Sequence, residues 1–299
     1  MADSGKRLAP VLALVVNAFV WGMSWWPFRQ LQDEGMHPLW STALIYLVAF
    51  LGFVLVRPGA LPELLRTPGL WLLAAAAGLT NVGFNWAVTI GDVVRVVLLF
   101  YLMPAWSVLL AWPLLGEKPS RAGMARLVLA LAGVAIVLDT SGVGLPWPRT
   151  LAEWLALMGG FSFALTNVML RRLDTSTAGS RVLAMFGGGM LLAGGVAMAG
   201  MAQGSVAAMP LLEGSGWLLA LLLAAGFLAA NLALQYGASR LPAHTTALVM
   251  LSEVVFASLS SVALGAAELT ARTLLGGALI VAAAAWSAWP ARASLAGAQ

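Results

Sequence analysis

The sequence predicts an all-α membrane protein with ten transmembrane helices, arranged as two five-helix repeats of inverted topology. Composition is the first reason: 61% of the 299 residues are hydrophobic and 9% are charged, whereas about 25% of residues are charged in a typical soluble domain. Mean hydropathy is +0.91. The second reason is a series of ten apolar runs, each close to the roughly 20 residues that a helix needs to cross a bilayer. The third is an internal similarity between the two halves of the chain.

The ten runs are separated by short segments that are rich in proline, glycine or charged residues. They lie near residues 8–28, 37–56, 69–91, 93–115, 122–139, 151–170, 180–202, 213–236, 243–265 and 272–290. The first run resembles a signal peptide, but it ends in tryptophans and has no small-residue cleavage site, so we expect it to be retained as a helix. Because the runs and their connections occupy nearly the whole sequence, we expect function to take place within the membrane.

The basic residues predict the orientation of these helices, because basic loops mark the cytoplasmic side of a membrane. If the chain starts inside, the even-numbered connections and both tails hold twelve of the 16 Lys and Arg residues. The opposite side holds Arg29, Arg95, Arg149 and Arg272. We therefore expect a multi-pass protein of the plasma membrane, the inner membrane in a bacterium, with both termini in the cytoplasm. Since these charges orient helices, they do not imply a nucleic-acid partner.

Similar segments recur in the two halves of the chain. The matching pairs are NWAVTIG (85–91) with NLALQYG (231–237), LMPAWSVLLAWPLLGEKPSR (102–121) with LSEVVFASLSSVALGAAELTAR (251–272), and WGMSWWPFRQL (21–31) with FALTNVMLRRL (163–173). Five helices is an odd number, so the second half must cross the membrane in the opposite sense. The predicted repeats are residues 1–140, with helices one to five, and 141–299, with helices six to ten. Such inverted repeats are typical of secondary transporters, whose substrate site lies near the midplane between the halves.

Each half ends in the same way, with a helix that carries a proline or a glutamate, a short Gly116-Glu117 or Ala267-Glu268 turn, and a final helix of small residues. Over almost the whole chain this pattern resembles the drug/metabolite transporter superfamily, and the Trp-rich helices look most like bacterial exporters of aromatic amino acids. Family copies commonly carry a proline in the ninth helix, where this chain has Val254, so the resemblance does not carry a kink over to that point.

The resemblance implies a secondary transporter that exports aromatic or other neutral, hydrophobic amino acids and related small metabolites by alternating access. A multidrug, nucleoside or metabolite facilitator of the same fold is the alternative. No Lys or Arg lies at the middle of a run, so a phosphate or a lone carboxylate would lack a buried basic partner. A zwitterion fits better, because its ammonium can meet amide oxygens and aromatic faces.

Polar and aromatic side chains inside the apolar runs mark a candidate substrate site. Asn81 and Asn85 share one helix face and should face protein or water, because an unpaired polar group in hydrocarbon costs several kcal/mol. The residues that we expect at a central cavity are Asn17, Trp21, Asn81, Asn85, Trp86, Tyr101, Phe163, Asn167, Asn231, Gln235 and Glu253. The alternative for each amide is a structural hydrogen bond between helices, worth about 0.6–2 kcal/mol. For each aromatic residue the alternative is core packing.

Glu253 is the only acidic residue near the centre of any run, where a charge costs about 2.5–3.5 kcal/mol or more. Three interpretations are open: it is neutral, it is paired with a neighbouring helix or the substrate, or it binds and releases a proton during transport. Pro104, in the fourth run, cannot donate to the carbonyl of Phe100 and predicts a kink. That kink would be either a gate or a static bend.

An intramembrane enzyme and a channel are the competing classes. The sequence has no cysteine, no HExxH or GxSxG motif, and no acidic pair within the runs, so we expect neither catalysis nor a metal or other cofactor. A channel would need a filter motif or rings of charge, which are not evident. The predicted partners are the lipid bilayer and a small-molecule substrate. The oligomeric state is left open, and a monomer is compatible with the sequence.

Overall fold

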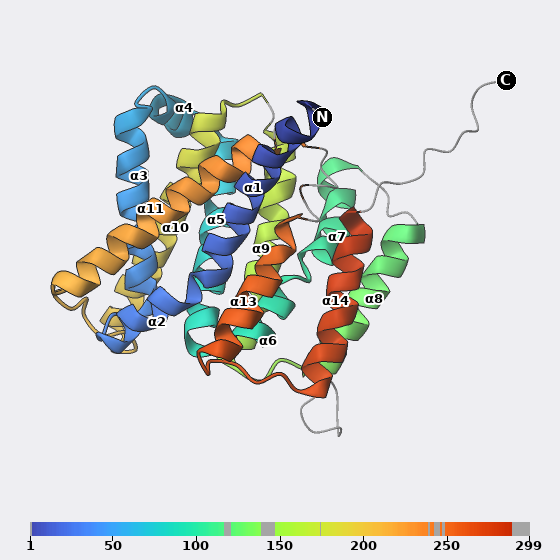
Figure 1. Cartoon of the computed structure of the whole chain (residues 1–299). Helices are drawn as coiled ribbons and strands as arrows, with labels where there is room; N and C mark the ends of the chain where they lie inside the picture. The colour runs from blue at the N-terminus through green and yellow to red at the C-terminus, as the bar shows by residue number, and fades with distance from the viewer. Residues whose placement is uncertain are drawn as a thin grey trace.

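A computed structural model of the chain describes residues 2–116, 121–138, 147–173, 175–238, 240–241, 246 and 249–288. Within these residues the regular secondary structure is helical and no strand occurs (Figure 1). Eight helical segments are long and apolar enough to cross a membrane. They are Leu8–Asp33, Pro38–Val56, Pro68–Ile90, Val93–Leu115, Arg121–Leu138, Leu151–Arg172, Ala178–Ala202 and Gly214–Gly237.

Two shorter apolar helices, Ser252–Ala263 and Ala271–Trp286, lie where the ninth and tenth runs are predicted. Part of the ninth run, at 243–245 and 247–248, lies outside the described residues, as do Glu117 of the first predicted turn and residues 289–290 of the tenth run. The all-helical membrane fold is thus confirmed, while ten spans in two inverted repeats remain a prediction.

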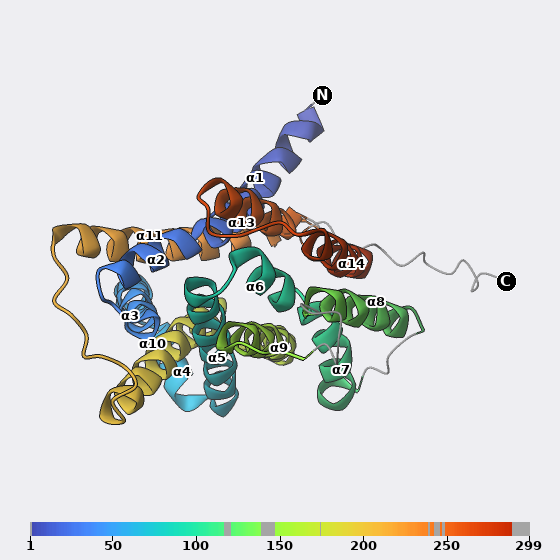
Figure 2. The ribbon, with the colours of Figure 1, turned by 90° about the horizontal axis from the view of Figure 1, so that it is seen from below.

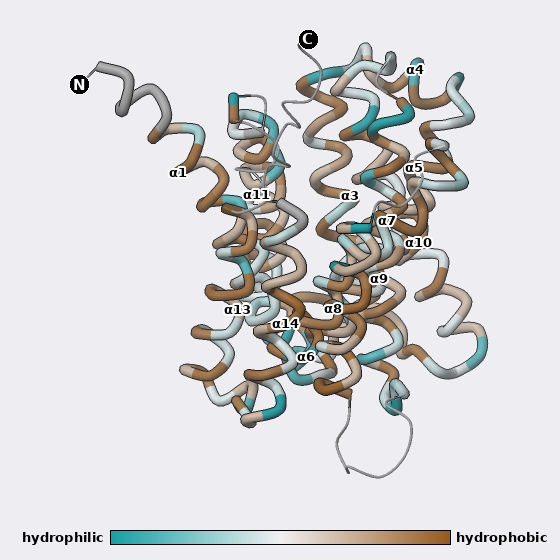
Figure 3. The backbone as a smooth tube through the Cα atoms, turned by 90° about the vertical axis from the view of Figure 1, so that its right-hand side faces the viewer, coloured by the Kyte–Doolittle hydropathy of each residue, from teal (hydrophilic) through white to brown (hydrophobic). Residues whose placement is uncertain are grey.

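The helices follow one another with short connections, as the spacing of the apolar runs predicts. They are α1 (Ala2–Met23), α2 (Trp25–Asp33), α3 (Pro38–Val56), α4 (Ala60–Arg66), α5 (Pro68–Ile90), α6 (Val93–Phe100), α7 (Met103–Leu115), α8 (Arg121–Leu138), α9 (Leu151–Arg172), α10 (Ala178–Ala202), α11 (Gly214–Ala238), α13 (Ser252–Ala263) and α14 (Ala271–Ala288). Figure 3 shows hydrophobic residues along the middle of most helices, with hydrophilic residues mainly near the two ends of the molecule.

Small residues let several helices approach one another closely. A Cβ atom at Gly78 would lie 2.4 Å from the carbonyl oxygen of Gly188, which joins α5 to α10. A Cβ atom at Gly133 would lie 2.7 Å from the carbonyl oxygen of Gly276, which joins α8 to α14. Small residues are enriched at helix contacts in membranes, because the hydrophobic effect does not drive association there. These contacts fix which helices are neighbours (Figure 2).

The short helix α6 lies at the centre of the molecule, between α5, α9 and α13 (Figure 2). Seven of its eight residues are buried, and they form the largest hydrophobic cluster together with residues of α5, α8, α9, α13 and α14. Apart from Arg95 near its start, α6 is apolar on all sides, and such a helix is expected to be buried rather than to face water. The C-terminal end of α6 therefore positions side chains in the interior of the protein.

The predicted fourth run is interrupted, because α6 ends at Phe100 and α7 begins at Met103. Pro104 lies in the first turn of α7, where a proline is tolerated since its missing N–H would have no helical partner. The predicted kink is therefore a complete break between two helices. A second break precedes α13: Leu251 is a turn residue between helical Met250 and Ser252, although no proline lies beside it.

Candidate substrate site

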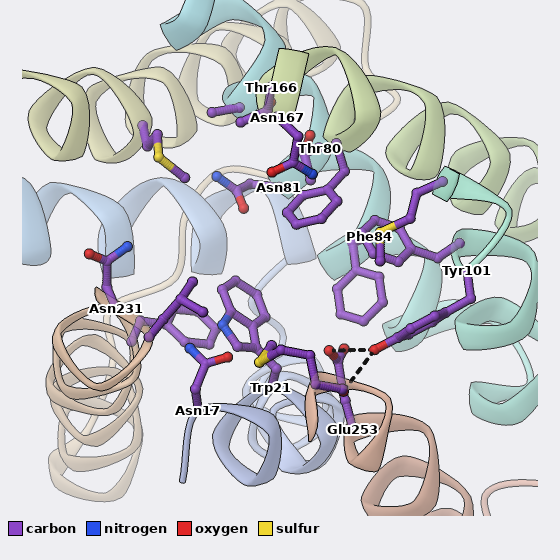
Figure 4. A pocket seen from close by; sticks show the side chains of 18 of the residues that line it. Asn17, Trp21, Thr80, Asn81, Phe84, Tyr101, Thr166, Asn167, Asn231 and Glu253 are labelled. Atoms are coloured by element: carbon purple, nitrogen blue, oxygen red, sulfur yellow. Dashed lines mark hydrogen bonds between the residues drawn. The ribbon is translucent and has the colours of Figure 1, made fainter. Parts of the chain in front are cut away.

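A cavity of about 310 Å³ lies in the interior of the helix bundle (Figure 4). Its walls come from α1, α3, α5, α6, α7, α9, α10, α11, α13 and α14, so both halves of the chain contribute. This volume is at the lower end of the roughly 300–1,000 Å³ that is typical of ligand sites. The predicted residues that line it are Asn17, Trp21, Asn81, Tyr101, Pro104, Phe163, Asn167, Asn231 and Glu253.

Three predicted residues do not line the cavity. Asn85 is fully buried between α5 and α3, where its Nδ2 donates to Thr42 Oγ1 at 3.3 Å. Four residues advance a helix by about 40° beyond a full turn, so Asn85 no longer points in the same direction as Asn81. Trp86 packs edge-on against His37, with 5.1 Å between the ring centroids. Gln235 is exposed and donates to Asn231 Oδ1 at 2.8 Å.

Amide side chains from four helices form part of the cavity wall. The Nδ2 of Asn17 donates to the carbonyl of Ala230 in α11 at 2.7 Å, while its Oδ1 is buried and has no hydrogen-bond partner among the described residues. Asn81 Oδ1 accepts from Tyr46 Oη at 2.7 Å. Asn167 and Asn231 add two further amides from α9 and α11. A buried amide oxygen that lacks a donor is costly, so Asn17 Oδ1 can accept a hydrogen bond from a bound molecule.

Aromatic rings line the cavity beside these amides. Trp21 stacks on Phe227, with 4.5 Å between the ring centroids and 17° between the ring planes. Phe100 contacts both Phe84 and Phe163, with centroid separations of 4.7 and 5.5 Å. These rings come from α1, α5, α6, α9 and α11. They provide apolar surface, together with ring faces that attract a cation.

Several lining residues were missed at the level of sequence. The missed polar and aromatic ones are Tyr46, Thr80, Phe84, Phe100, Phe186 and Phe227. Some of them adjoin predicted residues in sequence, and this proximity could have identified Thr80 and Phe84 beside Asn81 and Asn85. Phe227, one helical turn before Asn231, could have been identified in the same way, whereas the sequence offers no comparable signal for Tyr46.

Glu253 and Tyr101 meet at the floor of the cavity, from helices 152 residues apart in sequence. The Oη of Tyr101 lies 3.0 Å from Glu253 Oε2 and 3.2 Å from the carbonyl oxygen of Met250 (dashed lines in Figure 4). Tyr101 follows the last residue of α6, and Glu253 lies in the first turn of α13. Both breaks in the helices therefore bring a polar side chain to the same point.

Basic side chains lie outside the cavity, since its lining contains no Lys, Arg or His among the described residues. Arg29 donates to the carbonyls of Val88 and Gly91 at the end of α5. Arg95 forms an ion pair with Glu153, at 2.7 Å between Nη2 and Oε1. These links lie near the end of the molecule where α2 ends and α6 begins, the lower end in Figure 1. Within the described residues, no cluster of His, Cys, Asp and Glu could hold a metal ion.

Comparisons with known proteins agree with the predicted resemblance. Residues 8–139 match the EamA-like transporter family. The chain is 29% identical over 164 residues to "Protein RarD" from Streptomyces exfoliatus, a match that spans 52% of this chain and 49% of that protein. The chain thus matches about half the length of this relative. A crystal structure titled only "Crystal structure of protein" is similar in fold, with a TM-score of 0.58 and 20% identity, over 94% of this chain and 96% of that one.

These matches confirm the drug/metabolite transporter superfamily that the sequence resembles. The apolar helices and the interior cavity are consistent with that assignment. Because a structural likeness at 20% identity shows the fold alone, the family assignment depends on the two sequence matches. Residues 8–139 match the EamA-like transporter family, and this match together with the apolar helices indicates a multi-pass membrane protein of the drug/metabolite transporter superfamily.

Proposed function

We propose that this protein is a secondary transporter that exports aromatic or other neutral, hydrophobic amino acids and related small metabolites across the plasma membrane. The observation that carries the proposal is the chemistry of the cavity. Its lining combines aromatic rings, amides and one carboxyl group, and has no basic side chain among the described residues. This combination suits a molecule with an apolar ring and a small polar end that bears no net negative charge.

The amides in the lining would bind both charges of an amino acid. An ammonium group would donate to Asn17 Oδ1, which lacks a partner among the described residues. The carboxylate would accept from the amides of Asn167 and Asn231, which replace a basic residue as donors. The side chain would lie against Trp21 and Phe84, where burial of an aromatic ring contributes about 1.5–3 kcal/mol.

Ten membrane spans in two inverted repeats, 1–140 and 141–299, are part of the proposal. Two aligned positions support them: in the segments that match at 102–121 and 251–272, α7 begins at Met103 and α13 begins at the aligned Ser252. Each fourth helix of a repeat is thus broken at the same place. Interrupted helices in corresponding positions of two repeats are the feature that marks a substrate site in many transporters.

Alternating access would require the lower end in Figure 1 to open and close. Arg29 links α2 to α5 there, and the side chain of Asp92 accepts from the backbone N–H of Glu268 at 3.2 Å. If both termini are cytoplasmic, this end faces away from the cytoplasm. Opening the cavity to that side would break these links, so they are expected to stabilise the closed state.

A facilitator of organic cations or nucleosides is the second candidate, because the only charged group that can form in the described lining is the carboxylate of Glu253. Counterflow in proteoliposomes separates these candidates. Purified protein is tested with labelled L-tryptophan, L-phenylalanine, L-leucine, uridine and a cationic dye. We expect saturable counterflow of the aromatic amino acids; uptake of only the dye or uridine would replace our proposal by the second candidate, and unsaturable flux would indicate a channel.

A matched pair of variants tests whether the amides bind substrate. Asn167→Leu changes a residue that lines the cavity, whereas Asn85→Leu makes the same change at a buried residue outside it. Loss of a hydrogen bond to a charged group costs about 1.5–3 kcal/mol, so we expect Asn167→Leu to raise KM at least about tenfold. Asn85→Leu should lower the melting temperature and leave the KM of the folded protein near that of the wild type. The same change in KM for both variants would contradict the proposed site.

A further inference from the structure

The two broken helices meet through three groups that we call the clasp: the phenol of Tyr101, the backbone carbonyl of Met250 and the carboxyl of Glu253. Tyr101 and Met250 are 149 residues apart, the offset at which their segments align. A residue and its own repeat counterpart come into contact only near the axis that relates the two repeats. The clasp therefore lies where α6 of the first half contacts α13 of the second.

The clasp has too few hydrogen atoms if Glu253 is ionised. A tyrosine hydroxyl has one hydrogen, and both a carboxylate and a backbone carbonyl only accept. The usual helical donor to Met250 would be the N–H of Val254, but this N–H donates to the carbonyl of Leu251 at 3.1 Å. The one hydrogen of Tyr101 would then have to serve two buried acceptors, and an acceptor left without a donor costs about 1–3 kcal/mol.

Protonation of Glu253 resolves this shortage. The carboxyl hydrogen then points to the oxygen of Tyr101, and the hydrogen of Tyr101 points to the carbonyl of Met250. Each group has a partner, and the chain of hydrogen bonds connects α13 to α6 across the floor of the cavity. The distances of 3.0 and 3.2 Å suit both bonds of this chain.

Among the described residues, no cation faces Glu253 that could replace the proton. Glu253 is 7% exposed, and α13 packs against α1 and α6. The described side chains of α1, residues 8–23, include no titratable group. On α6, Tyr101 faces the carboxyl, while Asp92 and Arg95 lie at the opposite end, where Arg95 is paired with Glu153. An ionised carboxyl here would be a buried charge with no counterion among the described residues, which is strongly unfavourable.

We infer that Glu253 is the proton-binding site through which transport is coupled to H⁺: it holds a proton while the clasp is formed and releases it to water when the clasp opens. The inference rests on the proposed transporter function and adds the coupling ion. Release leaves a carboxylate and transfers H⁺ to water, so charge and atoms balance. Protonation would then favour the clasped state, because a ligand shifts an equilibrium toward the state that binds it more tightly.

The first experiment needs no substrate. Infrared difference spectra of the full chain in lipid nanodiscs are recorded while the pH is changed. We expect the carbonyl stretch of a protonated carboxyl at neutral pH in the wild type, and its loss in Glu253→Gln. Glu268→Gln is the matched control, because Glu268 is an exposed acid outside the cavity, and it should retain the band. If the wild type has no such band at neutral pH, the inference is wrong.

The second experiment measures coupling in proteoliposomes with tritiated L-tryptophan. Counterflow without a gradient tests the transporter function, and the ratio of uptake with and without a one-unit pH gradient tests the coupling. For one proton per substrate, the gradient supports up to about tenfold accumulation. When the pH gradient is oriented so that it drives tryptophan uptake, we expect an uptake ratio well above one in the wild type and in Glu268→Gln. In Glu253→Gln we expect an uptake ratio of one, whatever its absolute rate of transport.

The outcomes distinguish the two claims. Absence of counterflow would count against the proposed function, while the infrared spectra would still decide whether Glu253 carries a proton. The coupling would be overturned if the wild type shows counterflow but its uptake does not change with a pH gradient of either direction. It would also be overturned if Glu253→Gln has the same uptake ratio as the wild type. If Glu253→Gln does not yield folded protein, Tyr101→Phe serves instead. It keeps the carboxyl but removes the clasp, and its ratio should fall toward one.

Discussion

Gly188→Ala should separate two helices that form the wall of the cavity. A Cβ atom at this position would lie 1.9 Å from the carbonyl oxygen of Ala74 and 2.6 Å from its carbonyl carbon. Ordinary contact begins at 3.4 Å, so α10 and α5 would have to move apart by about 1.5 Å, the difference between 3.4 and 1.9 Å. No side-chain rotation relieves this contact, because the opposing atoms belong to the backbone.

The expected cost is at the upper end of the range for overpacking, about 3 kcal/mol in the free energy of unfolding. Met185 and Phe186 of α10 line the cavity, so the movement should also lower the affinity for substrate. Thermal unfolding of the purified protein in detergent, followed by the fluorescence of its 13 tryptophans, measures the stability. Counterflow measures the effect on the site.

Gly195→Ala is the matched control, because it makes the same change on the same helix where a Cβ atom meets nothing within 4 Å. Replacing glycine by alanine in a helix is otherwise favourable by about 0.5–1 kcal/mol, so this variant should melt at or above the wild-type temperature. Equal melting temperatures for Gly188→Ala and Gly195→Ala would refute the reasoning that α5 and α10 pack through their backbones.

Three further predictions concern other parts of the molecule. Tags at the two ends of the chain should both be accessible only from the cytoplasm, and a C-terminal tag on the other side would exclude ten spans. Hydrogen bonds from Ser180 and Thr177 lower the pKa of Glu63, so its contribution to stability is present at neutral pH and is lost as the pH falls through the lowered pKa. The melting temperature of the wild type should therefore fall more steeply in acid, below about pH 4, than that of Glu63→Gln; parallel curves would show that these bonds do not stabilise the fold. Arg95→Met should cost about 3 kcal/mol, because it leaves Glu153 buried without its partner, and most of this loss should disappear when Glu153→Gln is added; additive losses in thermal unfolding would argue against coupling.

The apolar runs predicted most helix positions well. The sixth and seventh runs, 151–170 and 180–202, correspond to Leu151–Arg172 and Ala178–Ala202. This agreement has a direct cause, since the thickness of the bilayer sets the length of an apolar run. The break inside the run 93–115 differs in kind. Pro104 marks it, but the sequence cannot show whether a proline bends a helix or ends one, because neighbouring helices decide how the freed carbonyls are satisfied.

The site was predictable in part. Asn17, Asn81 and Asn231 line the cavity as expected. An amide inside an apolar run must face a polar cavity or bond a neighbouring helix, because an unpaired polar group in hydrocarbon is costly. Asn85 is an equal candidate on helical spacing alone, yet it bonds Thr42 on α3. An asparagine inside an apolar run thus lines the cavity at position 81 and bonds a neighbouring helix at position 85. Only the rotation of α5 about its own axis distinguishes the two roles.

The sequence by itself determined that this is a membrane protein, roughly where its helices lie and that polar residues are buried within them, because hydropathy and charge act on each segment independently of the others. Only the tertiary structure decided that Tyr101 contacts Glu253 across 152 residues, and that Trp86 packs on His37 instead of facing the cavity. Contacts of this kind depend on how each helix is rotated and how closely it packs. Those quantities are set by backbone contacts such as that of Gly188 with Ala74, which the hydropathy of a single segment does not contain.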